Sequence, residues 1–170
     1  MVAQDISQFE DIYESYQGQV RNIIFRMNGE DEIDDLVQNT FIKIYQNLEG
    51  FKSESSLKTW IYRIAINTVK DHKKARSRKN WLNLFQPGHE IDVEVNDQFD
   101  QKISLKEASK LIREKLSIKH QEVIILYSFE DLDIAAISKV LKIPEGTVKS
   151  RLFKAHKVLK KFVELEDYDE

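Results

Sequence analysis

Cationic, amide and aromatic side chains share one face of a segment in the first half of the chain, where together they could bind nucleic acid. Arg63, Asn67, Lys70 and Lys74 recur at steps of three and four residues, so a helix places them in one stripe. Trp60 lies near the start of this stripe. Bases stack on aromatic rings while cations contact phosphates. The pattern predicts a surface for single-stranded nucleic acid, but a core position for Trp60 and a passive surface position for Asn67 fit the spacing equally well.

A second basic segment, near the C-terminus, has the spacing of a helix that reads duplex DNA. If its apolar residues face inward, the other face carries Lys149, Ser150, Phe153, Lys154 and Lys157, flanked by Arg151. Lysine and arginine bind phosphates or guanine, and a phenylalanine ring can contact a thymine methyl group. A short helix that Asp133 could cap, and then a tight turn, precede this segment. This order is typical of a helix-turn-helix, and a merely solvated basic helix is the alternative.

Charge is segregated along the chain. The 170 residues include 26 Lys and Arg and 29 Asp and Glu, which gives a formal net charge of −3. Residues 58–79 and 139–161 each carry eight Lys or Arg against a single acid, whereas residues 86–101 carry five acids and no Lys or Arg. Two basic blocks separated by an acidic connector favour two contacts with one polyanion over two unrelated solvated faces.

The composition argues against an enzyme and against a cofactor. The chain has no cysteine, and its four histidines are too scattered to form a ligand pair at helical spacing. No glycine-rich phosphate-binding motif occurs, and the acidic cluster Asp31–Asp35 lacks the glycine and the spacing of a calcium loop. We therefore expect no catalytic residues, no metal and no cofactor. No apolar run reaches the length of a membrane span and the start does not resemble a signal peptide, so we expect no membrane insertion and a cytoplasmic protein.

Apolar periodicity predicts an all-α fold of two small helical domains joined by an acidic linker. Helices are expected over residues 9–27, over 33–48 and from 57 onward, and they form an N-terminal helical bundle. Residues 80–100 lose this periodicity and contain a Pro-Gly pair, which indicates a linker. Four further helices over 103–162 predict a C-terminal four-helix helix-turn-helix domain. The expected division is 1–79, linker 80–102, and 103–170, which ends in an acidic tail.

Two passages resemble a known family. Residues 34–78 resemble the promoter −10-reading domain of bacterial sigma factors, and IPEGTVKSRLFKAHKVLKK (143–161) resembles their −35-reading helix-turn-helix. Both passages, in this order in so short a chain, are similar to the extracytoplasmic-function group of the sigma-70 family. The helix-turn-helix alone would also fit a stand-alone DNA-binding transcription regulator, with the N-terminal helices as a sensor or dimerisation module. That regulator is the alternative function.

The resemblance implies a function, binding partners and site residues. The chain would bind core RNA polymerase and promoter DNA, recognise both promoter elements and promote DNA opening, and an anti-sigma factor could hold it inactive. The polymerase-binding residues would be Asp34, Asp35, Gln38, Asn39 and Ile42. The −10 single strand would contact Phe51, Lys52, Ser53, Glu54, Ser55, Ser56, Trp60, Arg63, Asn67 and Lys70. The −35 duplex would contact Thr147, Lys149, Ser150, Arg151, Phe153, Lys154 and Lys157.

The sequence departs from the family pattern at two points that bear on these roles. Ser53 stands where the loop before the third helix usually has glycine, which affects base choice in the −10 pocket. Lys142 stands in the helix-turn-helix turn where glycine is common. Lysine rarely adopts a positive φ, so a strained or differently shaped turn is expected there.

Overall fold

The structure is a computed structural model that describes residues 2–51, 55–83 and 104–166. Seven helices account for most of these residues, and no strand occurs among them. The all-α prediction is therefore confirmed. The helices are α1 (Val2–Asn28), α2 (Ile33–Asn47), α3 (Leu57–Asn83), α4 (Leu105–Lys115), α5 (Ile118–Ser128), α6 (Ile134–Leu141) and α7 (Glu145–Glu166). In the described part of the chain, none of these helices is both long enough and apolar enough to cross a membrane.

The first three helices form the N-terminal module. Apolar side chains at helical spacing on each helix meet in one core, as expected for amphipathic helices; Ile23, Ile44 and Ile61 are all completely buried. Gly29 ends α1 with a φ of +88°, a conformation that favours glycine, and its N–H donates to the Phe25 carbonyl over 2.8 Å. Helix α3 continues to Asn83, past the expected end of the first domain at residue 79.

The last four helices form the C-terminal module, and local capping explains where they begin and end. The Ser104 hydroxyl and the Glu107 carboxylate form a reciprocal capping box at the start of α4. Asp133 accepts from the Ala136 N–H over 2.7 Å and so caps α6, as the sequence predicts. Lys142 ends α6 in the left-handed conformation, with φ 53° and ψ 48°. The turn of the helix-turn-helix is thus built on a lysine in a region that L-residues rarely occupy.

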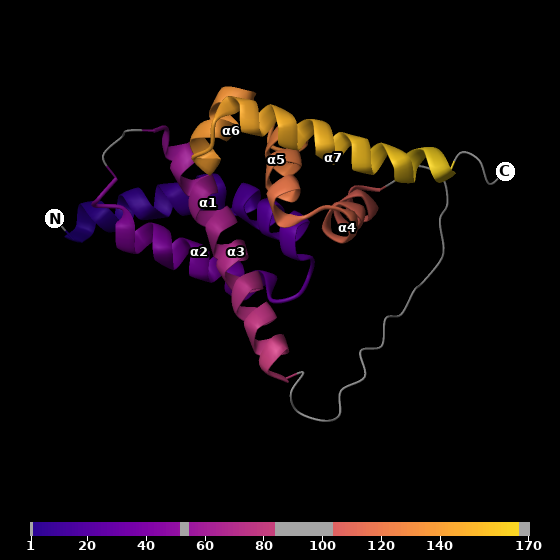
Figure 1. Cartoon of the computed structure of the whole chain (residues 1–170). Helices are drawn as coiled ribbons and strands as arrows, with labels where there is room; N and C mark the ends of the chain where they lie inside the picture. Colours follow the sequence, from indigo (N-terminus) through magenta and orange to yellow (C-terminus); the bar gives the residue numbers. More distant parts are fainter. Residues whose placement is uncertain (1, 52–54, 84–103, 167–170) are drawn as a thin grey trace.

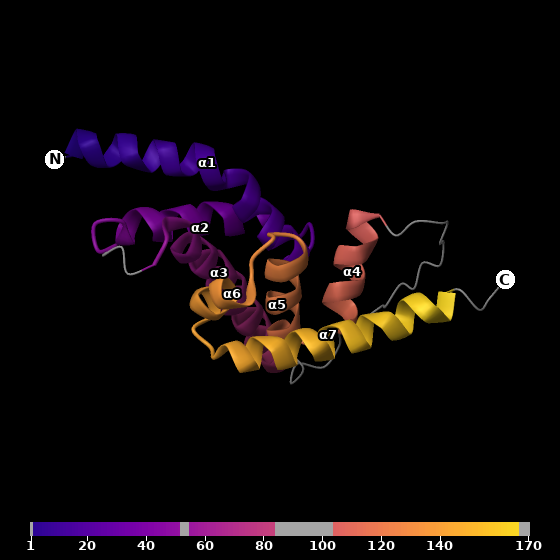
Figure 2. The ribbon, with the colours of Figure 1, turned by 90° about the horizontal axis from the view of Figure 1, so that it is seen from above.

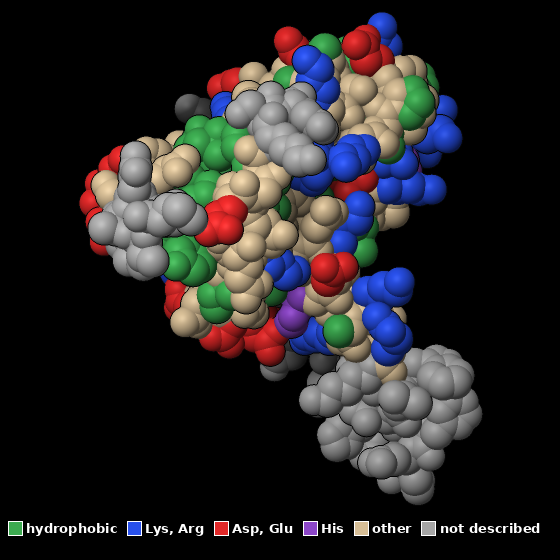
Figure 3. All heavy atoms as spheres, turned by 90° about the vertical axis from the view of Figure 1, so that its left-hand side faces the viewer, with side chains coloured by type: hydrophobic (Ala, Val, Ile, Leu, Met, Phe, Trp, Pro, Cys, Tyr) green, Lys and Arg blue, Asp and Glu red, His purple; other side chains and the backbone are tan. Residues whose placement is uncertain are grey.

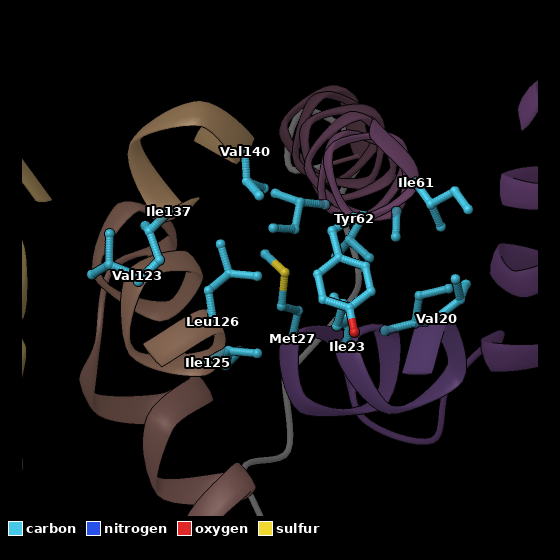
Figure 4. Packing of buried hydrophobic residues seen from close by; sticks show 14 of the residues in the cluster. Val20, Ile23, Met27, Ile61, Tyr62, Val123, Ile125, Leu126, Ile137 and Val140 are labelled. Atoms are coloured by element: carbon cyan, nitrogen blue, oxygen red, sulfur yellow. The ribbon is translucent and has the colours of Figure 1, made fainter. Parts of the chain in front are cut away.

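The two modules pack directly against each other (Figure 1). Helix α3 contacts α6, and α1 contacts both α4 and α5. Seen from above, α7 lies along the edge opposite α1 and α2, with α3, α5 and α6 between them (Figure 2). Figure 4 shows Val140 and Leu126 from one module directed toward Tyr62 and Met27 of the other. All four side chains are at most 1% exposed, so one continuous apolar core joins the modules.

Candidate nucleic-acid interface

Helix α7 presents an open basic face. Val148 and Ala155 are fully buried and Leu152 is 7% exposed, so these residues attach the helix to its module. The opposite face carries the exposed side chains of Lys149, Ser150, Phe153, Lys154 and Lys157. Phe153 is 69% exposed, which is unusual for a phenylalanine on a helix whose apolar face is already buried. A helix with exposed cations around an exposed ring can enter a DNA groove.

Arg151 and Thr147 lie differently from the rest of the predicted duplex-reading set. The Arg151 side chain is 22% exposed, and its Nη1 lies 2.8 Å from Oε1 of the buried Glu122 carboxylate in α5. A charge-assisted bond of this length fixes the guanidinium inside the module. Thr147 is half-buried, and its carbonyl accepts a hydrogen bond from the Ser150 hydroxyl over 3.0 Å. These two residues position the first turns of α7 in the structure.

The start of α3 brings together the predicted aromatic and loop residues. The rings of Phe51 and Trp60 are 5.1 Å apart between centroids and tilted by 39°. The Ser56 hydroxyl accepts from the Thr59 N–H over 3.2 Å, which is the bond of a helix N-cap. Asn67, one helical turn beyond Arg63, is exposed. Phe51, Ser55 and Trp60 are half-buried. The remaining predicted loop residues Lys52, Ser53 and Glu54 lie outside the described residues.

The two predicted strand-binding cations of α3, Arg63 and Lys70, face the C-terminal module. Arg63 donates from Nε to the Val140 carbonyl over 3.1 Å and from Nη2 to the Lys139 carbonyl, both in α6. Lys70 Nζ lies 3.0 Å from Oε2 of Glu122. These contacts join residues that are 52 to 77 positions apart in the chain.

A cavity of about 560 Å³ separates the start of α3 from the helix-turn-helix turn. Phe51 and Trp60 line one side, and Lys139 and Lys142 line the other, with Arg63 between them. This volume is in the range of pockets that take small ligands. The predicted strand-binding aromatics thus border a space that residues of both modules enclose.

Buried polar groups that the sequence analysis did not single out hold the modules together. The Tyr62 hydroxyl donates to Oε2 of Glu130 over 2.8 Å. Arg26 Nη1 lies 3.6 Å from Oε1 of the same carboxylate, and the Arg26 guanidinium carbon sits 4.5 Å from the Phe129 ring centroid. Burial raises the pKa of both Glu130 and Tyr62. The signal for these groups is weak in the sequence, because their partners lie far away along the chain.

A separate groove runs between α1 and α2. It has a volume of about 840 Å³, and three of the predicted polymerase-binding residues, Asp34, Gln38 and Ile42, line it. Asp35 and Asn39 are exposed on α2 beside it. Tyr13 and Tyr45 also line the groove and are 41% and 49% exposed, although both fall at the apolar spacing of their helices. The apolar stripes of α1 and α2 are wider than their shared core, which leaves an exposed apolar strip.

The surface charge follows the same division. In Figure 3, acidic side chains gather toward the lower left, on the side of α1 and α2, whereas Lys and Arg spread over the opposite side, toward α7 and the C-terminal part of α3. Among the described residues, no group of three His, Asp or Glu side chains is arranged to hold a metal ion. The basic side of the molecule therefore suits a polyanion.

Comparison with known protein families gives two matches. Residues 12–79 match the family described as Sigma-70 region 2, and residues 113–159 match the family described as Sigma-70, region 4. The first match contains α2 and most of α3, and the second contains the helix-turn-helix.

Curated proteins are similar over nearly the whole chain. The RNA polymerase sigma-H factor of Pseudomonas aeruginosa is 31% identical over 169 residues, covering 90% of this chain and 84% of that protein. The ECF RNA polymerase sigma-E factor of Haemophilus influenzae is 29% identical over 170 residues, covering 91% of this chain and 87% of that protein.

Solved structures share the fold. The sigma factor RpoE of Bartonella quintana, in complex with the anti-sigma factor NepR, superposes with a TM-score of 0.71 at 22% identity, covering 96% of this chain and 99% of that one. CnrH, in complex with the cytosolic domain of CnrY, superposes with a TM-score of 0.65 at 21% identity, covering 99% of this chain and 96% of that one.

Proposed function

This chain belongs to the extracytoplasmic-function group of the sigma-70 family, and from that premise we propose how its residues share the work of promoter recognition and opening. It is a promoter-recognising transcription initiation factor, and the alternative of a stand-alone helix-turn-helix regulator is not favoured, because both sigma regions are present in order. The N-terminal domain (1–79) binds core RNA polymerase and the −10 strand. The C-terminal domain (103–170) binds the −35 duplex, and residues 80–102 link the two.

The −35 element is read by the open face of α7. Lys149 and Lys154 contact phosphates or guanine, Phe153 contacts a thymine methyl group, and Ser150 binds phosphate or a base edge. The single observation that carries this assignment is that these side chains are exposed on a helix whose other face is buried. Lys157 extends the phosphate contacts, and Thr147 lies near the DNA backbone. Arg151, predicted to contact DNA, is held by Glu122 in the structure and positions the start of the helix.

The −10 strand is held by the start of α3 and the loop before it. An extruded base costs a few kcal/mol to unstack, so its pocket must supply compensating contacts. The Phe51 and Trp60 rings, together with the exposed Asn67 amide, offer stacking and a hydrogen bond. Arg63 and Lys70 contact the phosphates of the same strand when they are free of their present partners.

Core polymerase docks on the α1–α2 groove and the adjoining face of α2. The groove combines an apolar floor with the charged pair of Arg21 and Asp34, 2.7 Å apart at its rim. An apolar centre with a polar rim is the usual anatomy of a protein–protein interface. An anti-sigma protein is a second partner, as in the solved complex of RpoE with NepR. The protein acts in the bacterial cytoplasm and catalyses no reaction of its own.

Run-off transcription with purified core polymerase on a genomic promoter library tests this proposal. The chain plus core should give discrete promoter-dependent transcripts that core alone does not give. A gel shift with and without core separates the alternative, because a stand-alone regulator would bind a specific duplex tightly without polymerase. Specific binding by the chain alone, with no promoter-dependent transcript, would overturn the proposal.

A further inference from the structure

On the face of α3 that the proposed function gives to single-stranded DNA, the two cations Arg63 and Lys70 are engaged by the chain's own C-terminal module. Arg63 places its guanidinium on the carbonyls of Lys139 and Val140 at the end of α6. These acceptors stand where the proposal puts phosphate oxygens. The two carbonyls occupy the Nε–Nη2 edge of the guanidinium, so this edge cannot at the same time form a forked bond with a phosphate.

One buried carboxylate, Glu122, pairs with two predicted DNA-binding cations, one from each module. The Glu122 side chain is 3% exposed, and its two oxygens lie 3.0 Å from Lys70 Nζ in α3 and 2.8 Å from Arg151 Nη1 in α7. A carboxylate so deeply buried requires cationic partners. Lys70 is therefore its partner across the modules, and a DNA phosphate must compete with Glu122 for the Lys70 ammonium.

The contact continues into an apolar core and a second polar pair. Tyr62 and Leu126 are both completely or almost completely buried where the modules meet (Figure 4). The Tyr62 hydroxyl donates to Glu130 over 2.8 Å beside this core. Separating the modules would expose these apolar side chains and break the Tyr62–Glu130 bond. The contact therefore has its own stability, independent of any third molecule.

The duplex-reading face of α7 is not covered in the same arrangement. Lys149, Phe153 and Lys154 are exposed while Arg63 and Lys70 are engaged. Figure 2 shows α7 on the edge of the molecule away from α1 and α2. The proposed duplex-binding surface of α7 is thus accessible to DNA, whereas the cations of the proposed strand-binding surface of α3 are engaged.

The geometry points to a closed state in which α5 and α6 act as an intramolecular competitor of single-stranded DNA for α3, with the Glu122 carboxylate and the Lys139 and Val140 carbonyls in place of the phosphates. This inference rests on the proposed function for the roles of Arg63 and Lys70. In the closed state the −35-reading face stays available, and strand binding requires the modules to separate. The apparent affinity for a single strand is then the intrinsic affinity reduced by the open fraction.

Energy transfer within the full-length chain tests the closed state without DNA or polymerase. Because the native chain has no cysteine, a donor and an acceptor can be attached at Ser77→Cys in α3 and Ser128→Cys in α5, both exposed positions. The otherwise unaltered chain should show one predominant high-transfer population. Glu122→Gln and, independently, Tyr62→Phe should each raise the open-to-closed ratio about tenfold, as expected for losing a hydrogen bond to a charged group. Glu145→Gln, at an exposed acid of α7, is the matched control and should change nothing.

A second arm of the experiment tests the competition. Fluorescent single-stranded oligothymidylate should bind Glu122→Gln and Tyr62→Phe about tenfold more tightly than the native chain, by the same change in open fraction. Low energy transfer in the otherwise unaltered chain, or energy transfer that the two variants leave unchanged, would overturn the closed state. Opened variants that bind the strand no better would overturn the competition. Neither failure would touch the proposed sigma function, which transcription with core polymerase judges separately.

Discussion

The Tyr62 hydroxyl donates a hydrogen bond over 2.8 Å to the carboxylate of Glu130, which lies 68 positions further along the chain. This bond crosses from the helix assigned to the −10 strand to the turn that follows α5 in the −35-reading module. Both groups lie beside the core that the modules share. The relationship makes the stability of the module contact sensitive to the charge on Glu130.

We predict that Glu130 makes the native state less stable as the pH rises. Burial raises the pKa of Glu130, with Asp131 acting in the same direction and Tyr62, Arg26 and Lys58 opposing it. A carboxyl whose folded-state pKa is raised binds its proton more tightly when folded, so its contribution to stability falls as pH rises through that pKa. The melting temperature of Glu130→Gln relative to the native chain should therefore increase between about pH 5 and about pH 7. A difference that is constant with pH, or larger in acid, would show that the carboxylate is not penalised by burial.

We predict that Asn67→Ala impairs promoter opening more than closed-complex formation. The exposed amide is assigned to an extruded base, which exists only after melting. Permanganate reactivity of the −10 thymines should fall by a factor consistent with about 1 kcal/mol or more, while gel-shift affinity for the closed complex stays the same. Asn22→Ala, at an exposed amide of α1, is the matched control. Equal losses in both steps would remove the base-pocket assignment.

We predict opposite signatures for two neighbouring cations of α7. Lys149 is exposed, so Lys149→Ala should reduce the salt slope of −35 duplex binding by about 1 and leave the melting temperature unchanged. Arg151 is bonded to the buried Glu122, so Arg151→Ala should lower the free energy of unfolding by about 1–3 kcal/mol. Thermal melting and salt-dependent gel shifts measure the two effects. A native melting curve for Arg151→Ala would contradict the structural role of the pair.

We predict that Ile42→Glu weakens binding to core polymerase without unfolding the protein. Ile42 is 44% exposed on the rim of the α1–α2 groove, so a charge there costs little in the free chain but is buried unpaired in the complex. Affinity for core should fall at least tenfold, as for a hot-spot residue. Leu105→Glu is the control, since Leu105 is 69% exposed on α4, outside the groove. Equal effects of the two substitutions would argue against the groove.

We predict that Lys142→Gly stabilises the helix-turn-helix. The left-handed conformation costs a non-glycine residue about 1 kcal/mol, so the melting temperature should rise by about 2–4 °C. Lys139→Gly, inside α6, should do the reverse, because glycine weakens a helix interior. A lower melting temperature for Lys142→Gly would mean that the lysine side chain compensates for its backbone strain.

Local patterns in the sequence predict the helices well because each pattern reports a nearby physical requirement. The apolar spacing of residues such as Ile23 and Ile44 reflects burial in one core, and Asp133 acts on a backbone N–H three positions away. The turn at Lys142 is foreseeable for the same reason. The exposure of Tyr13 and Tyr45 was not foreseen, since periodicity tells which face is apolar but not how much of it a neighbour covers.

The contact between the modules could not be predicted from the sequence. It depends on pairs such as Lys70 with Glu122, whose separation of 52 positions leaves no periodic signal. Glu122 looks like an ordinary helix-surface acid until its burial is known. The assignment of individual residues to promoter bases and to polymerase remains a prediction that the experiments above address.

Permanganate footprinting of a promoter selected with reconstituted holoenzyme tests most directly whether this chain reads one element as duplex and opens the other. We expect reactive thymines in the −10 element only when both the chain and core polymerase are present, and loss of that reactivity when the −35 element is replaced. Protection of a specific duplex by the chain alone, with no reactive thymines when core is added, would contradict it.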